Sequence, residues 1–123
     1  MKFSEDTGRG IHRIDAYAAG LIRVSGRDYG AGLAVSATEI IEGWGPQTPD
    51  GLAAEHIAAL LELDPQVIVI GTGAHQVFPR AALFAQSNAR GVGLEVMDTG
   101  AACRTYNILV GEGRRVVAGL MIF

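Results

Sequence analysis

The sequence predicts an α/β fold, because strand and helix patterns alternate over the second half of the chain. The apolar run at residues 67–70 and the run at 94–97 each end at a corner rich in glycine and threonine. A helical pattern separates the two runs, and a strand, a helix and a strand within about thirty residues form a βαβ unit with parallel strands. We therefore expect a single three-layer domain over residues 1–123, with a central mixed sheet and an N-terminal antiparallel strand meander.

The first half of the chain carries closely spaced strand patterns instead. Residues 1–10 are polar with two glycines, so we expect a flexible arm there. Four short strand patterns follow at residues 13–17, 21–24, 33–35 and 38–44. Consecutive strand patterns are separated, in order, by Gly20, by the segment 26–30 and by residues 36–37. Strands so close in sequence pair as antiparallel hairpins, because parallel pairing needs a long crossover.

A loop at residues 45–51 separates the two halves. Its Asp50 is a candidate N-cap for a helix at residues 53–63, whose apolar residues recur at helical spacing. The run at 67–70 that follows has no polar interruption, which indicates a strand covered on both faces.

The remaining elements follow from capping signals and apolar content. Pro79 suits the first turn of a helix that reaches about residue 89, with Gly91 as its C-cap. A third helix is predicted over residues 101–110. The last segment, 114–123, has almost no polar residue after Arg115, so we expect a strand in the centre of the sheet.

Composition and charge exclude several classes of protein. The net charge is −3 and the ten basic residues are scattered, which argues against a nucleic-acid binder. Cys103 is the single cysteine, so neither an intramolecular disulfide nor a cysteine-based zinc cluster is expected. No apolar run approaches the ~20 residues that span a bilayer, and the first residues do not resemble a secretory signal. We therefore expect a cytoplasmic protein that is not an integral membrane protein.

The two corners mark a candidate ligand site. In open α/β sheets, ligands bind beyond the carboxyl ends of parallel strands, where the loops diverge. Both corners lie at such ends, and we expect them to converge on one rim. The predicted cleft comprises Thr72, Gly73, His75, Asp98, Thr99, Cys103 and Asn107.

Three kinds of chemistry compete with structural roles, and two of them would use this rim. A dinucleotide site is suggested by Gly71, Gly73 and the acid Asp98, but Gln76 stands where a third glycine belongs. A Cys–His pair is suggested because Cys103, expected in the first turn of its helix, would have a lowered pKa with His75 as base. The structural alternatives are a tight glycine turn and a cysteine packed as a small apolar residue.

The remaining polar residues indicate structure more than chemistry. His12, His56 and His75 lack the paired spacing of metal ligands, and we expect neither a metal nor a cofactor. Asp98 and Thr99 are good N-caps for the third helix. Asn107 is unfavourable in a helix interior, so we expect its side chain to be buried and bonded to one of the corners.

The C-terminal half resembles a known family. The pattern joins Gly71-Thr72-Gly73, Asp98-Thr99, Thr105-Tyr106-Asn107 and Glu112-Gly113-Arg114 at characteristic spacings. It is similar to the family of the mitochondrial respiratory complex I (NADH:ubiquinone oxidoreductase) assembly factor 3 and its small bacterial and archaeal relatives. The resemblance is strong over about half of the chain and looser over residues 33–44. It implies a three-layer α/β domain, no established enzymatic activity for most members, and action through protein partners.

Two functions from different classes follow. The leading one is a non-enzymatic protein that binds a protein partner, such as a subunit of a respiratory complex during its assembly. The alternative is a small-molecule-binding protein or an enzyme that uses the predicted cleft. Trp44, beside the loop at 45–51, is the aromatic residue that we expect to be exposed for a partner.

Overall fold

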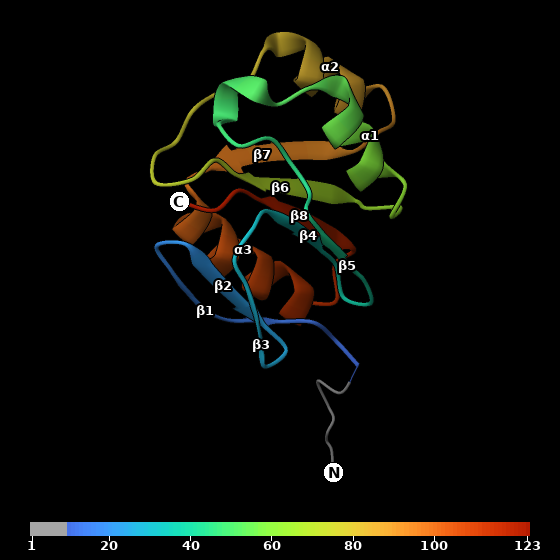
Figure 1. Cartoon of the computed structure of the whole chain (residues 1–123). Helices are drawn as coiled ribbons and strands as arrows, with labels where there is room; N and C mark the ends of the chain where they lie inside the picture. The colour runs from blue at the N-terminus through green and yellow to red at the C-terminus, as the bar shows by residue number, and fades with distance from the viewer. Residues whose placement is uncertain (1–9) are drawn as a thin grey trace.

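The computed structural model describes residues 10–123 and contains two β-sheets (Figure 1). The arm predicted for residues 1–10 therefore lies outside the described residues, except for Gly10. A small antiparallel sheet has the order β1-β2-β3, formed by Ile14–Ala18, Leu21–Val24 and Arg27–Tyr29. It confirms the predicted N-terminal meander.

The larger sheet is mixed and has five strands in the order β5-β4-β8-β6-β7. Its strands are β4 (Leu33–Val35), β5 (Ile40–Glu42), β6 (Val67–Gly71), β7 (Gly93–Met97) and β8 (Val116–Leu120). The pairs β6–β7 and β6–β8 are parallel, whereas β4 pairs antiparallel with both β5 and β8. The predicted parallel βαβ unit and the central position of the last strand are confirmed.

Helices cover both faces of this sheet (Figure 1). On one face lie α1 (Ala54–Leu61) and α2 (Ala81–Asn88), with the short 3-10 helix η1 (Pro49–Gly51) before them. On the other face lies α3 (Thr99–Gly111), which is sandwiched between the two sheets. Among residues 10–123, no helix combines the length and apolar character needed to cross a membrane.

The side chains of β6 alternate between two cores, as the period of two in a strand requires. Val67 and Val69 pack in the core that contains α3 and the small sheet. Ile68 and Ile70 pack in the core beneath α1 and α2. Both faces are buried, which explains the uninterrupted apolar run.

The strand β3 was not predicted, because the segment 26–30 was interpreted as a turn only. The turn is in fact two residues long: Ser25 and Gly26 have φ of 51° and 80°. Such left-handed pairs form tight hairpin turns that suit twisted strands. Arg23 and Asp28 then face each other across the hairpin, with Nε donating to Oδ1 at 2.6 Å.

The helix boundaries and some of the capping residues differ from the predictions. Asp50 lies in η1 and does not cap α1, whose N-cap is Ala53; there the backbone N–H donates to His56 Nδ1 at 2.9 Å. Pro79 precedes α2, which begins at Ala81. The C-cap of α2 is Ala89, and Gly91 follows it with φ of 73°.

The prediction that Trp44 is exposed was wrong, since only 4% of this residue is accessible. Its indole Nε1 donates to the backbone oxygen of His56 at 3.0 Å, which ties the residue to α1. Its ring lies over Gly119 of β8, where an added Cβ would approach a ring carbon to 2.6 Å. Trp44 is therefore a core residue and not a contact for a partner.

The contact between Trp44 and Gly119 gives a stability prediction. We expect Gly119→Ala to lower the free energy of unfolding by about 1–3 kcal/mol, because the new methyl group overpacks the indole. Gly93→Ala on β7 is the matched control, since its Cβ would meet only Val67 Cγ2 at 3.7 Å. We expect that change to stay within about 1 kcal/mol of the wild type. Urea denaturation measures both, and equal effects would contradict the role assigned to Gly119.

Candidate functional site

The structure brings the two predicted corners together at the carboxyl ends of β6 and β7. The backbone N–H of Thr72 donates to Met97 O at 2.9 Å, and that of Thr99 donates to Gly73 O at 2.9 Å. We call the four residues Thr72, Gly73, Asp98 and Thr99 the rim. Their proximity follows from the parallel pairing of β6 with β7, which places both strand ends at one edge.

The Thr99 hydroxyl is fully engaged inside the protein. The residue has no accessible surface, and Oγ1 accepts from Gly73 N at 2.8 Å and donates to Met121 O at 2.6 Å. It thereby joins the segments that leave β6 and β8 at the first residue of α3. A Cβ at Gly71 would lie 2.8 Å from Thr99 Cα, so only glycine permits this close approach.

The Thr72 hydroxyl anchors the loop of residues 74–80, which connects β6 to α2. Oγ1 donates to His75 O at 2.5 Å, lies 3.2 Å from Met97 O, and accepts from Val77 N at 3.1 Å. A hydroxyl has one proton to donate, so this donor is already used. Thr72 is only 3% exposed.

Asp98 acts as the N-cap of α3, as predicted. Its Oδ1 accepts from Ala101 N at 2.8 Å, which satisfies a free backbone donor of the first turn. Its negative charge also lies at the positive end of the helix dipole.

Cys103 and His75 lie in different environments. His75 is exposed on the 74–80 loop, whereas Cys103 is 1% exposed in the core around α3. Burial raises the pKa of Cys103 from its ordinary 9.0 to about 12. The predicted lowering was wrong because α3 begins at Thr99, so Cys103 lies beyond the first turn and faces the core.

Asn107 contacts β1, not a corner, and the prediction on this point was wrong. Its Oδ1 accepts from Ile14 N at 2.9 Å, and its Nδ2 donates to Ile14 O at 2.8 Å. The amide thus pairs with β1 as a neighbouring strand would. Tyr106, which has no accessible surface, adds a bond from its hydroxyl to His12 O at 2.7 Å.

Sequence reasoning missed two features near the rim. Tyr17 of β1 accepts a hydrogen bond from Arg104, and its ring lies where a Cβ on Gly100 would come within 2.9 Å. Nothing local in the sequence connects these residues. The apolar pair Val77-Phe78 within a loop was a signal that could have been noticed: these residues are 41% and 69% exposed.

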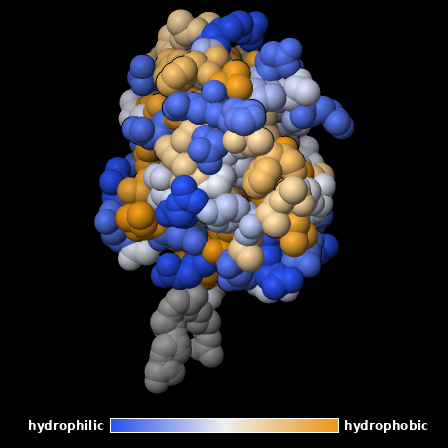
Figure 2. Space-filling model, turned by 90° about the vertical axis from the view of Figure 1, so that its left-hand side faces the viewer, coloured by the Kyte–Doolittle hydropathy of each residue, from blue (hydrophilic) through white to orange (hydrophobic). Residues whose placement is uncertain are grey.

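Apolar and polar groups are mixed on the face around this loop. The 74–80 loop lies at the left of Figure 1, next to the C-terminus. Figure 2 views the molecule from that side and shows apolar residues gathered in groups among hydrophilic ones. Phe123, 38% exposed, lies beside Gly73 at the base of the loop.

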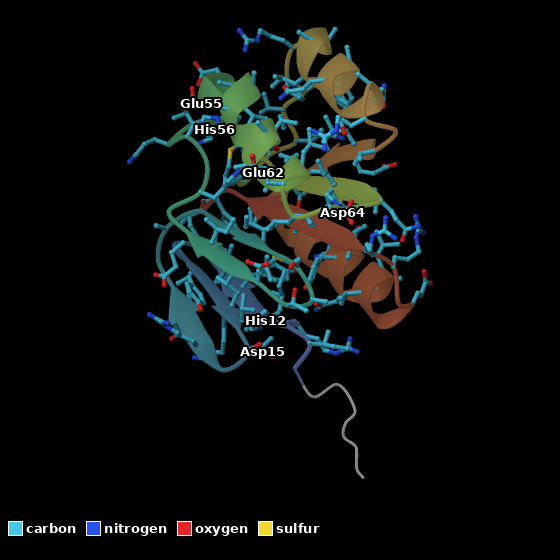
Figure 3. The ribbon with its side chains drawn as sticks, turned by 90° about the vertical axis from the view of Figure 1, so that its right-hand side faces the viewer. His12, Asp15, Glu55, His56, Glu62 and Asp64 are labelled. Atoms are coloured by element: carbon cyan, nitrogen blue, oxygen red, sulfur yellow. The ribbon has the colours of Figure 1, made fainter. Side chains whose placement is uncertain are left out.

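The histidines do not assemble a metal site within the described residues. His12 lies beside the small sheet, where its Nδ1 forms a hydrogen bond of 2.9 Å with Ser25 Oγ. His56 lies on α1 (Figure 3). Residues 10–123 contain no group of three or more histidine, cysteine or acidic side chains that could hold a metal.

The Thr99 hydroxyl gives the second stability prediction. Thr99→Val keeps the shape but leaves Gly73 N–H and Met121 C=O buried without this partner, and we expect a loss of about 2–4 kcal/mol. Thr105→Val is the matched control, since among residues 10–123 that hydroxyl bonds only to the Met97 sulfur, at 3.3 Å; we expect a loss of about 1 kcal/mol or less. Urea denaturation distinguishes them. A Thr99→Val variant as stable as the control would contradict the crosslinking role.

The burial of Cys103 gives a prediction on reactivity. The thiolate is the reactive form, and the folded protein forms it only as the pH approaches the raised pKa. We expect a thiol reagent at about pH 8 to label the native chain at least about 100-fold more slowly than the urea-unfolded chain. Equal labelling rates in the two states would contradict the burial.

Comparisons with known proteins agree with this fold. The chain is 35% identical to a Bordetella parapertussis protein whose crystal structure it matches with a TM-score of 0.88, over 93% of this chain and 98% of that one. It is 31% identical over 102 residues to the "13 kDa major membrane protein" of Francisella tularensis, a match that covers 81% of this chain and 82% of that protein.

A longer relative carries the name that the resemblance indicated. The chain is 30% identical over 110 residues to NADH dehydrogenase (ubiquinone) 1 alpha subcomplex assembly factor 3 of Danio rerio. That match covers 88% of this chain but only 63% of the factor. The resemblance is confirmed. The model of the family described as protein of unknown function (DUF498/DUF598) matches residues 14–121, so the chain belongs to this family.

Proposed function

We propose that this chain is a cytoplasmic, non-enzymatic protein that binds a protein partner and assists the assembly of a respiratory membrane complex. The carrying observation is the exposed pair Val77-Phe78 on the 74–80 loop. The relative named as a complex I assembly factor supports the choice of partner.

The energetics of Phe78 favour a partner. Burying such a side chain fully contributes about 1.5–3 kcal/mol, and most of this gain is lost when 69% of the residue is exposed. A partner that covers Phe78 and Val77 would bury these side chains and so recover this free energy. Large aromatic residues of this kind often dominate binding at protein interfaces.

The base of the loop is already ordered, which lowers the cost of binding. The Thr72 hydroxyl bonds to both His75 O and Val77 N, and Gln76 Nε2 donates to Val96 O at 2.9 Å. These contacts fix residues 75–77 of the loop on the sheet edge. Less conformational entropy is then lost when a partner binds.

The rim supports the non-enzymatic choice over the alternative of a small-molecule-binding protein or enzyme. The hydroxyls of Thr72 and Thr99 bond within the protein, and a ligand would have to replace these bonds. Asp98 is engaged as a helix cap, and the thiol of Cys103 is buried. Internal hydrogen bonding, helix capping and core packing therefore explain the presence of these side chains.

The test is an affinity pull-down of the tagged chain from its own cells, followed by mass spectrometry. We expect respiratory-complex subunits to co-purify with the wild type and to fall by at least about fivefold with Phe78→Ser, because that change removes the apolar contact. Ile108→Ser is the matched control, since Ile108 is 61% exposed on α3, away from the loop.

Each outcome decides a different part of the proposal. Recovery of the subunits with Phe78→Ser as with the wild type would contradict the role of the loop. Equal loss with Ile108→Ser would assign the effect to general surface change. Absence of respiratory-complex subunits from the wild-type sample would contradict the assembly function.

A further inference from the structure

A hollow of about 370 Å³ lies at the edge of the sheet opposite the rim. It is lined by the segments that enter three parallel strands: 64–66 before β6, 90–92 before β7, and 114–115 before β8. Its volume falls within the about 300–1,000 Å³ typical of small-molecule sites. We call it the arginine hollow, because Arg90, Arg114 and Arg115 line it.

The charge of this lining is opposite to that of the chain. Three arginines and one acidic residue, Asp64, line the hollow, whereas the whole chain has a net charge of −3. Figure 3 shows Asp64 at this end of the sheet, with nitrogen-tipped side chains gathered beside it. Like charges held together repel, and an anion between them relieves the repulsion.

Arg115, which lines the hollow, is anchored by two hydrogen bonds. Its backbone N–H donates to Gln66 Oε1 at 3.0 Å, and its Nε donates to the backbone oxygen of Asp64 at 3.1 Å. The Asp64 carboxylate is more distant, at 4.0 Å from Nε, and both side chains are largely exposed, so this ion pair is weak. The terminal nitrogens of Arg115 stay available to a ligand.

Arg90 and Arg114 are held in place by backbone hydrogen bonds. Within residues 10–123, neither guanidinium forms an ion pair. Arg90 N donates to Ser87 O at 3.0 Å, and Arg114 N donates to Leu109 O at 3.1 Å. Each guanidinium presents five donors in a planar fork that matches a phosphate group in a bidentate manner.

We propose that the arginine hollow binds the phosphate group of a small phosphorylated molecule. The observation is the convergence of Arg90, Arg114 and Arg115 around one hollow of ligand size at the amino ends of β6, β7 and β8. The phosphate can be free in solution or carried by a lipid headgroup, since both offer the same oxygens. The site is separate from the rim and does not depend on the proposed partner function.

A structural explanation competes with this proposal. Arg90 follows the C-terminus of α2 and Arg114 follows that of α3, where basic residues interact favourably with the helix dipole. That role requires only that each arginine stabilise its own helix. It predicts a change in stability on substitution and no saturable binding of phosphate.

The test is a titration of the full chain with inorganic pyrophosphate, followed by amide NMR at low ionic strength. We expect saturable shifts at the amides of Gln66, Gly91 and Arg115, and weaker binding as salt is added. Arg90→Ala and Arg114→Ala should each weaken binding by at least about tenfold, and Arg114→Lys should weaken it less because the charge remains. The NMR spectra also show whether each variant is folded.

Arg80→Ala is the matched control. Arg80 is also exposed and lies at the other end of α2, so its loss changes the net charge equally. A second arm measures binding to vesicles of phosphatidylcholine with and without phosphatidic acid. Binding to these vesicles alone, lost with Arg90→Ala and not with Arg80→Ala, supports the site with a lipid-borne phosphate.

Two results would overturn the proposal. One is the absence of shifts at the lining amides together with no vesicle binding that depends on Arg90. The other is equal weakening by Arg80→Ala, which would show that net charge, and not the hollow, attracts the anion. In either case the helix-terminus explanation stands.

Discussion

The position of α3 depends on one buried hydroxyl. Thr99 Oγ1 bonds to Gly73 N and Met121 O, so the segments beyond β6 and β8 meet at the first residue of the helix. Gly71 lacks a Cβ, and this absence lets the helix start approach β6. The direction of α3 across the sheet is thereby set at its N-terminal end, where Asp98 also completes the hydrogen bonding of the first turn.

The small sheet depends in turn on α3. A small antiparallel sheet is stable only when it has an apolar face to bury or a helix to pack against. The core around Tyr106 and Val110 of α3 supplies that surface for Ile22 and Val24 of β2. Asn107 fixes the alignment, because its amide forms two bonds with the backbone of Ile14. A residue unfavourable inside a helix is thus explained by a contact 93 positions away.

The difference between local and distant contacts also explains which predictions held. The strand β6, the parallel unit and the central β8 were predictable, because apolar content and turn residues lie within each segment. The identity of the rim followed from topology. The burial of Trp44, the partner of Asn107 and the environment of Cys103 were not predictable, because each depends on residues distant in sequence: Gly119, Ile14 and the core around the sheet. The turn at Ser25-Gly26 was missed because a serine with left-handed φ is uncommon.

The two ends of the parallel strands differ for a physical reason. At the carboxyl edge, the N-terminus of α3 would attract anions, but Asp98 already occupies it and the threonine hydroxyls are bonded internally. The exposed groups there include the apolar side chains of Val77 and Phe78. At the amino edge, the loops carry three arginines and one acid. The C-termini of α2 and α3 explain the presence of Arg90 and Arg114, respectively. Each guanidinium nevertheless has five N–H donors, more than an interaction with a helix end uses. The amino edge therefore offers an anion more cationic side chains than the carboxyl edge does, whereas ligands of open α/β sheets usually bind at the carboxyl edge.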